Sequence, residues 1–370
     1  MILNLKIAIV GLPNVGKSTL FNALTNAGAL AANYPFATIE PNVGIVPVPD
    51  ERLDVLAKMY DTDKIVPAAV EFVDVAGLVA GASKGEGLGN KFLAHIRECQ
   101  AICHVVRAFK NNDIVRADNR PEDDIITQAK DDIDIINLEL QLADEETRAK
   151  VEAKRKKDPG DEYIPYLTDK PVIYMFNVDE SGLADQDLQD KLRKVVNEVR
   201  KNRPFASIAT NGELLASEPR NDGRERSGEQ KDDFANLDQT IFVNAKLEEE
   251  MSGMSHEERK EFLKSYGVEH DALEELIKAA YDVLGLQSFL TAGKKECRAW
   301  TIKKGSTAPE AAGAIHSDFE RGFIAANICN YDDLKKYGSE KAVKEAGKLR
   351  TEGKTYIMKD GDVVEFKFNV

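Results

Sequence analysis

The sequence predicts an α/β fold: a doubly wound, mostly parallel sheet with a helical insertion, plus a small α+β domain. Over residues 1–285, apolar segments of strand length alternate with amphipathic helical segments, a pattern typical of a parallel sheet covered by helices. A charged helical segment, about 122–165, and a polar loop, 206–238, interrupt this alternation. Over residues 286–370 short strands surround one helix, so a separate small domain is expected there.

The composition excludes several classes of protein. With 370 residues, 42% hydrophobic and 31% charged, the chain is long enough for a large core and two or three domains. No apolar run approaches the ~20 residues that span a bilayer, and the N-terminal segment is too short for a signal peptide, so we expect a cytoplasmic protein without a membrane partner. A net charge of −14 argues against a surface that binds nucleic acid throughout. Four scattered cysteines favour reduced structural thiols: Cys99, Cys103, Cys297 and Cys329.

A phosphate-binding loop is the clearest motif. Residues 7–18 read I-A-I-V-G-L-P-N-V-G-K-S, an apolar strand that turns at a glycine and enters an amphipathic helix expected over 19–26. The glycines at both ends of the loop let consecutive backbone N–H groups point inward, and the helix adds its positive N-terminal end. Lys17 is predicted to reach the β- and γ-phosphates, and the Ser18 hydroxyl to occupy one Mg²⁺ position.

Two later segments predict the rest of a nucleotide switch. An irregular stretch with two prolines contains Thr38, the candidate to reach Mg²⁺ and the γ-phosphate. The motif F-V-D-V-A-G-L at 72–78 places Asp74 at the end of an apolar strand, where a carboxylate is expected to support the metal, and offers the Gly77 N–H to the γ-phosphate. Leu78 stands where many GTPases carry a glutamine that orients water, so help with hydrolysis must come from elsewhere or from a partner.

The remaining elements follow in chain order. The pattern predicts strands over 43–48, 68–73, 101–106, 171–180 and 240–243, and helices over 51–59, 91–99, 123–157 and 188–201. The helix over 123–157 is strongly charged and is expected to protrude from the core. In the C-terminal domain a single helix is expected over 308–320, and the pair Asp360-Gly361 predicts a β-hairpin turn.

Basic residues gather at two places in the sequence. Between Arg148 and Lys157, six basic residues accompany one acid. The second group consists of Lys294, Lys295, Arg298, Lys303 and Lys304. Each group fits either a solvated face or a contact with RNA or a ribosome.

The tetrad Asn177-Val178-Asp179-Glu180 lies where GTPases place Asn-Lys-x-Asp, the motif that recognises guanine. Here valine replaces the lysine, and glutamate, one methylene longer, replaces the last aspartate. A charge-assisted hydrogen bond contributes ~1.5–3 kcal/mol, so a displaced carboxylate forfeits much of the preference for guanine. The segment Asn244-Ala245-Lys246 resembles the Ser-Ala-Lys base loop of ordinary GTPases and favours GTP. These residues alone leave ATP and GTP about equal.

Together the motifs resemble those of the YchF family of Obg-related ATPases, also called Obg-like ATPases. The resemblance covers nearly the whole chain, and its most specific segment is the glycine-rich run G-A-S-K-G-E-G-L-G-N at 81–90. Its other segments are Gly11–Thr19, 33–42, Asp74–Gly77, 359–362 and 368–370.

This resemblance implies a P-loop NTPase domain, or G domain, of the Obg type with a coiled-coil insertion and a C-terminal β-grasp domain of the TGS type. It also implies hydrolysis of ATP in preference to GTP, and association with ribosomes. By position, the implied phosphate ligands are Asn14, Val15, Gly16, Lys17, Ser18 and Thr19; the metal ligands are Ser18 and Thr38; and the adenine contacts are Asn177, Val178, Glu180 and Asn244. Asn14 matches a loop asparagine that holds K⁺ in related GTPases, so stimulation by K⁺ is a hypothesis.

Three features depart from the family pattern. The insertion has one long helix and little room for a returning one, and the loop 206–238 is an addition. Where the family has a histidine proposed to assist hydrolysis, this chain has Arg116, which either offers positive charge to the γ-phosphate or is simply solvated. His95 and His104 are expected to be packed or surface groups.

The sequence therefore predicts a slow, monomeric, Mg²⁺-dependent ATPase that acts as a nucleotide switch. Lys17, Thr38 and Gly77 are the residues predicted to stabilise the reacting γ-phosphate. Two alternatives stay open. One is a GTPase of the Obg type with the same chemistry, and the other is a module that binds RNA or a ribosome and in which the nucleotide has only a structural role.

Overall fold

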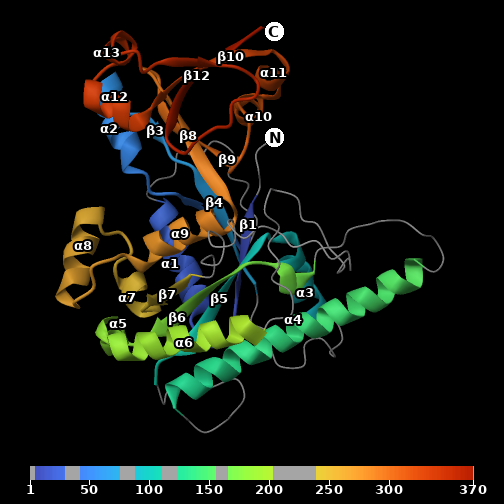
Figure 1. Ribbon diagram of the computed structural model, residues 1–370. Helices are drawn as coiled ribbons and strands as arrows, with labels where there is room; N and C mark the ends of the chain where they lie inside the picture. The colour runs from blue at the N-terminus through green and yellow to red at the C-terminus, as the bar shows by residue number, and fades with distance from the viewer. Residues whose placement is uncertain are drawn as a thin grey trace, which may run out of the picture.

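Two six-stranded sheets organise the residues that the computed structural model describes (Figure 1). The described residues are 5–29, 42–75, 88–110, 124–155, 166–202 and 239–369. The first sheet carries the phosphate-binding loop, and the second is built almost wholly from the C-terminal region of the chain.

The first sheet has the strand order β2-β4-β1-β5-β6-β7. Its parallel strands are β1 (Lys6–Val10), β4 (Ala69–Asp74), β5 (Ala101–Ala108), β6 (Val172–Val178) and β7 (Thr240–Val243), and β2 (Val43–Pro47) runs antiparallel to β4. Every residue of β5 and β6 is buried, as expected for parallel strands covered on both faces. The predicted bounds of β7 are confirmed, and the other bounds shift by a few residues.

Helices cover both faces of this sheet, so the predicted double winding is confirmed (Figure 1). On one face lie α1 (Lys17–Ala29) and α9 (Ala272–Val283), and on the other lie α3 (Leu88–Glu98), α4 (Ile125–Arg155) and α6 (Gln186–Asn202). Four further helices follow in the chain: η1 (Leu167–Asp169), α5 (Glu180–Ala184), α7 (Ala245–Glu250) and α8 (His256–Ser265). Helix α1 begins earlier than the predicted 19–26, because the end of the phosphate loop is already helical, and it also ends later, at Ala29.

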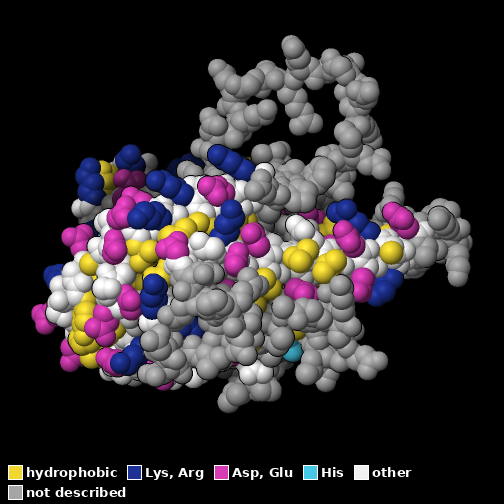
Figure 2. Space-filling view, turned by 90° about the horizontal axis from the view of Figure 1, so that it is seen from below, with side chains coloured by type: hydrophobic (Ala, Val, Ile, Leu, Met, Phe, Trp, Pro, Cys, Tyr) yellow, Lys and Arg dark blue, Asp and Glu magenta, His cyan; other side chains and the backbone are white. Residues whose placement is uncertain are grey.

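Helix α4 does not protrude over its whole length as predicted. Its buried apolar residues recur at helical spacing, from Ala129 to Ala143, and pack on β5 and α6. The Asp144 carboxylate, 4% exposed, accepts hydrogen bonds of 2.9 Å from the backbone N–H groups of Leu167 and Thr168 and fixes the middle of the helix. Only the last turns extend beyond the core (Figures 1 and 2). The high charge of this segment concealed the apolar stripe within it.

The second sheet has the strand order β11-β10-β12-β8-β9-β3. Its strands are β3 (Ile65–Val66), β8 (Leu286–Ala292), β9 (Cys297–Lys303), β10 (Phe323–Asn330), β11 (Arg350–Glu352) and β12 (Asp362–Phe368). Helix α10 (Ala308–Ile315) packs on β9 and β10, and α2 (Glu51–Tyr60) packs on β3, β8 and β9 and on α12 (Tyr331–Tyr337), which is followed by α13 (Glu340–Glu345). The N-terminal segment 51–66 therefore lies with the second sheet, across the predicted boundary at residue 285.

Two predictions for the C-terminal domain were wrong. The helix expected over 308–320 is broken at His316, whose backbone is extended (φ −161°, ψ 142°) and whose Nδ1 accepts a hydrogen bond from the N–H of Asp318 at the start of α11 (Ser317–Arg321). The Asp360-Gly361 turn joins no hairpin, because β12 pairs with β10 and β8 and not with β11. Hydrogen bonds of Asp360 with the distant residues Arg52 and Ser288 shape that turn.

The second basic group of the sequence is not a cluster in space. Lys294 and Lys295 precede β9, whereas Lys303 and Lys304 lie at its other end. Across the face shown in Figure 2, basic side chains are interspersed with acidic ones. The four cysteines are buried and free. Among the described helices, none combines the length and the apolar character that crossing a membrane requires.

Candidate nucleotide-binding site

The loop between β1 and α1 lies close against β5 and β6. A Cβ atom on Gly11 would lie 2.4 Å from the Val105 carbonyl oxygen, and one on Gly16 would lie 2.5 Å from Nδ2 of Asn177. Gly16 has φ +102°, and Asn14 also adopts a positive φ, 62°. Only glycine fits at 11 and 16, so the sequence dictates the shape of this loop. The loop ends at the N-terminus of α1, where backbone N–H groups favour an anion.

The Lys17 side chain is held against the loop. It is 7% exposed, and its Nζ donates a hydrogen bond of 2.7 Å to the Leu12 carbonyl oxygen. Burial lowers the pKa of Lys17 to about 8, and the nearby Asp74 carboxylate partly opposes this shift. A phosphate group placed at the loop would offer the ammonium a stronger, charge-assisted partner than a carbonyl.

Ser18 and Asp74 meet because β1 and β4 are neighbouring parallel strands, with Ile9 in register with Asp74. The Ser18 hydroxyl donates a hydrogen bond of 3.2 Å to Oδ2 of Asp74. Burial raises the pKa of Asp74, although Ser18 and Lys17 act in the opposite direction. Oδ1 of Asp74 is buried, and no described residue donates a hydrogen bond to it. A hydroxyl beside an unsatisfied carboxylate oxygen fits a hard cation such as Mg²⁺.

Asn177 joins the phosphate loop to the segment after β7. Its Nδ2 donates to the Val15 carbonyl oxygen, and its Oδ1 accepts from the Ala245 N–H, both at 3.0 Å. The side chain is 7% exposed. In this arrangement the Asn177 amide joins two loops. The adenine contact expected of Asn177 from the sequence stays a prediction.

The rest of the predicted base-binding set is arranged around two short helices. Val178 is buried in β6, and the Asp179 carboxylate caps α5 by accepting a hydrogen bond of 2.9 Å from the Gly182 N–H. Glu180 is exposed at the first turn of α5. Asn244 caps α7, with its Oδ1 3.0 Å from the Leu247 nitrogen. The C-terminal ends of β6 and β7 therefore bring Asn177, Val178, Glu180 and Asn244 to one edge of the sheet.

Several predicted site residues lie outside the described residues: Thr38, Gly77, Leu78 and Arg116. Of the phosphate-loop residues, Val15 is buried and Thr19 is partly buried. His95 is exposed, and His104 is buried with its ring 5.7 Å from that of Tyr174, in agreement with the expectation that both are surface or packed groups.

Comparison with known proteins identifies the family. A family model described as a 50S ribosome-binding GTPase matches residues 6–178, and one described as a protein of unknown function (DUF933), the C-terminal domain of YchF GTPases, matches residues 286–369. A protein of Bacillus subtilis named ribosome-binding ATPase YchF is 46% identical over 374 residues, which cover 98% of each chain. The chain belongs to the YchF family.

Other YchF proteins are similar over the same extent. The ribosome-binding ATPase YchF of Haemophilus influenzae is 45% identical over 403 residues, covering 99% of each chain. The structure of the Schizosaccharomyces pombe YchF GTPase matches with a TM-score of 0.76 at 33% identity and covers 98% of each chain. The predicted family and the predicted P-loop α/β fold with a C-terminal domain are thus confirmed.

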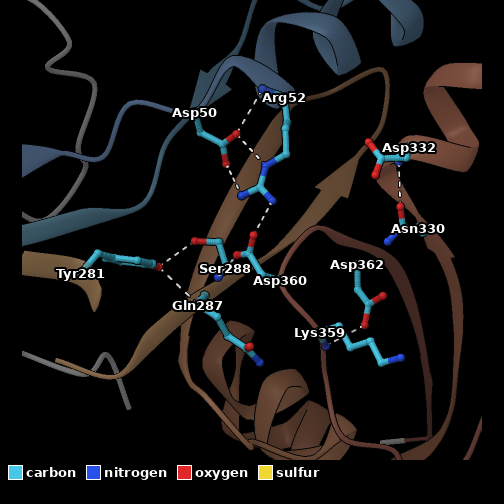
Figure 3. Close-up of polar contacts among 10 residues, drawn as sticks. All are labelled: Asp50, Arg52, Tyr281, Gln287, Ser288, Asn330, Asp332, Lys359, Asp360 and Asp362. Atoms are coloured by element: carbon cyan, nitrogen blue, oxygen red, sulfur yellow. Dashed lines mark hydrogen bonds and ion pairs between the residues drawn. The ribbon is translucent and has the colours of Figure 1, made fainter. Parts of the chain in front are cut away.

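Two arginine clusters in this YchF chain were not predicted from the sequence. In the Arg52 cluster, Arg52 lies between Asp50 and Asp360, and in the Arg259 cluster, Arg259 lies between Glu248 and Asp271 (Figure 3 shows the first). Asp50 and Asp271 each precede a helix that they cap, a signal the sequence does carry. The pairing of Arg52 with a residue 308 positions away has no such local signal.

The Arg52 cluster fixes the turn before β12 (Figure 3). Arg52 donates to Asp50 from Nε and Nη2, at 2.7 and 2.8 Å, and to Oδ2 of Asp360 from Nη1 at 2.7 Å. The other oxygen of Asp360 accepts from the Ser288 N–H at 2.9 Å, and Gly361, with φ +78°, donates its N–H to the Ser288 carbonyl oxygen. The cluster therefore joins α2 to the second sheet.

Proposed function

We propose that this chain binds ATP together with Mg²⁺, hydrolyses it to ADP and phosphate in preference to GTP, and uses this cycle to control association with a ribosome. The observation that carries the proposal is the phosphate loop with Lys17 buried against it and Ser18 hydrogen-bonded to Asp74, whose other carboxylate oxygen has no partner among the described residues. Relatives of nearly equal length that are named ribosome-binding ATPases support the substrate and the partner.

In the proposed mechanism the backbone N–H groups of residues 14–19 bind the phosphates, and Lys17 exchanges its carbonyl partner for the β- and γ-phosphate oxygens. Mg²⁺, held by Ser18 and Thr38 with Asp74 behind them, would neutralise charge on the phosphate oxygens. Lys17, Thr38 and the Gly77 N–H stabilise the charge that develops on the γ-phosphoryl group as water attacks. Loss of the γ-phosphate removes the contacts of Thr38 and Gly77, and this change is what a ribosome would sense.

The arrangement around the tetrad supports a preference for ATP. The Asp179 carboxylate, which stands one position before the usual guanine-binding aspartate, is engaged in capping α5. Val178 is buried and carries no ammonium to cover the base. A guanine would therefore find no ammonium to cover it, and at the aspartate position it would find only the exposed Glu180 carboxylate, on a side chain one methylene longer.

A GTPase of the Obg type is the second candidate. The observation that favours it is the segment Asn244-Ala245-Lys246 at the end of β7, which resembles the base loop of GTPases. The S. pombe relative is also described as a GTPase.

Isothermal titration calorimetry with ATP and GTP, each with Mg²⁺ and with EDTA, tests the proposal. We expect tighter binding of ATP, and a loss of affinity of at least about tenfold for Lys17→Ala, because the ammonium makes charge-assisted hydrogen bonds to phosphate. Equal affinities for both nucleotides would favour the GTPase, and no response to either would overturn nucleotide binding altogether.

Co-sedimentation with ribosomes separates a switch from a module with structural nucleotide. A switch requires that Lys17→Ala also changes the fraction bound to ribosomes, because nucleotide and ribosome binding are then coupled. Unchanged ribosome association in Lys17→Ala would contradict the switch.

Three further elements of the proposal rest on the sequence. The first is a K⁺ site at Asn14, which is exposed and has a positive φ of 62°. Equal hydrolysis rates in Na⁺ and K⁺ would contradict this site. The monomeric state and the cytoplasmic location also remain predictions, and sedimentation velocity measures the first of them directly.

A further inference from the structure

The Arg259 cluster is a group of charges that the proposed phosphate chemistry does not use. Nη2 of Arg259, on α8, lies 2.7 Å from Oε2 of Glu248, on α7, and Nε donates to Oδ2 of Asp271 at 2.8 Å. The three side chains are 13%, 3% and 12% exposed in that order. Burying three charged groups is costly unless their geometry is well satisfied, so the position of each is tightly constrained by the other two.

Asp271 ties the cluster to the first sheet. Its Oδ1 caps α9 by accepting hydrogen bonds from the N–H groups of Leu273, at 2.9 Å, and Glu274, at 3.2 Å. Helix α9 packs against β4, β6 and β7. Asp271 is therefore held in place by α9, and Arg259, which contacts both carboxylates, restrains Glu248 relative to Asp271.

Glu248 in turn belongs to the helix that carries the base-side segment. Its N–H donates to the Asn244 carbonyl oxygen at 3.0 Å, one helical turn back, at the residue that caps α7. The next residue, Ala245, donates its N–H to Asn177, whose amide also binds the phosphate loop at Val15. Helix α7, Ala245–Glu250, also packs on α1, and the Arg259–Glu248 contact restrains it in addition to that packing.

A continuous set of contacts thus runs from the core through Asp271, Arg259 and Glu248 to the segment 244–247 beside the phosphate loop. Loss of the Arg259 contact would remove the restraint on α7 at Glu248, while the packing on α1 and the hydrogen bond from Ala245 to Asn177 would remain. The segment 244–247 would then shift relative to a bound base, but the phosphate loop would keep its shape.

We propose that Arg259 is a positioning residue for recognition of the nucleotide base: through Glu248 it sets where α7 presents the segment 244–247. The proposal rests on the proposed function, since it assumes that a nucleoside triphosphate occupies the loop. It concerns the base alone and leaves the phosphate contacts untouched.

The test compares a nucleotide with a probe that has no base. Calorimetric titrations with MgATP, MgGTP and magnesium tripolyphosphate are made on the full-length protein and on Arg259→Lys, whose single ammonium cannot bind both carboxylates as the guanidinium does. We expect MgATP affinity to fall about tenfold and the ATP-to-GTP ratio to shrink, because small displacements of positioning groups have large effects, while tripolyphosphate binding stays within about twofold.

Two further variants complete the experiment. Arg259→Met removes the positive charge and should lower the affinity for MgATP further than Arg259→Lys does. Arg52→Lys is the matched control, because Arg52 also lies between two carboxylates but belongs to the other cluster. It should leave the ratio of ATP to tripolyphosphate affinity unchanged. The inference is overturned if neither Arg259 variant changes that ratio. Failure of the wild-type protein to bind MgATP would instead overturn the proposed function.

Discussion

Each of the two arginine clusters pairs one arginine with two acidic residues, two aspartates at Arg52 and a glutamate and an aspartate at Arg259, but their surroundings differ. In each, one guanidinium lies between two carboxylates, one of which caps a helix. In the Arg259 cluster the side chains of Arg259, Glu248 and Asp271 are 13%, 3% and 12% exposed. In the Arg52 cluster those of Arg52, Asp50 and Asp360 are 25%, 10% and 55% exposed. The contact distances are nearly equal, so water access is what distinguishes them.

This difference decides what each cluster contributes. A charge close to water keeps much of its hydration, and the ion pair is then worth little in either direction. In the buried cluster the two carboxylates compete for one guanidinium, and burial, with the neighbouring charge of Asp271, raises the pKa of Glu248 to about 7. The Arg259 cluster should therefore respond both to mutation and to pH.

The largest effect is expected for Arg259→Met. Removing the guanidinium leaves two buried carboxylates without their partner, which typically costs about 3–5 kcal/mol. Urea unfolding followed by circular dichroism measures the change in the free energy of unfolding.

Glu248→Gln is the matched control for that prediction. It removes the surplus carboxylate but keeps an oxygen that can accept from Arg259, so its free energy of unfolding should stay within about 1 kcal/mol of the wild type. A larger loss in Glu248→Gln than in Arg259→Met would show that the cluster is not governed by its excess of negative charge.

The next effect is a dependence of stability on pH. The unfolded chain releases the Glu248 proton near its ordinary pKa of 4.5, whereas the folded chain holds it until about pH 7. The folded state therefore binds more protons between these values, so this contribution to stability is complete below pH 4.5 and is lost as the pH rises to 7. We expect a loss of about 1–3 kcal/mol over this window.

Urea unfolding measures the free energy of unfolding of the wild type and of Glu248→Gln at about pH 5 and at about pH 7.5. These two pH values enclose most of the range over which Glu248 is expected to titrate. The charged groups that act on Glu248 are Arg259 and Asp271, and both remain in the variant. Subtracting the two pH dependences removes the contribution of other titrating groups. Identical pH dependences in the two proteins would contradict the raised pKa of Glu248.

The phosphate loop could be predicted from the sequence because its chemistry is local. Gly11, Gly16, Lys17 and Ser18 lie within eight positions, and each residue type is required by the backbone or by the ligand. The meeting of Ser18 with Asp74 was also foreseeable, because parallel strands bring their C-terminal ends to one edge of the sheet. The parallel sheet itself could be predicted because strand-length and helical segments alternate along the chain.

What the sequence did not reveal depends on distant partners. The high charge of α4 concealed a buried apolar stripe that runs from Ala129 to Ala143. This stripe packs against β5 and α6. The Asp360-Gly361 pair has the local signature of a hairpin, yet Arg52 and Ser288 determine its geometry. Local propensity is a weak guide where tertiary hydrogen bonds replace a strand partner.

The smallest measurable effect is expected at the Arg52 cluster. Arg52→Met removes contacts to Asp50 and Asp360, but the 55% exposed Asp360 regains water, so the free energy of unfolding should fall by about 1 kcal/mol. The double variant with Asp360→Asn should lose less than the sum of the single variants, because the two residues share a contact. Lys191→Met, which breaks the exposed pair with Asp187, calibrates the scale and should cause no measurable change. A loss at Arg52 as large as that at Arg259 would mean that exposure is not what separates the two clusters, and that the junction of α2 with the second sheet contributes as much to stability as the core itself.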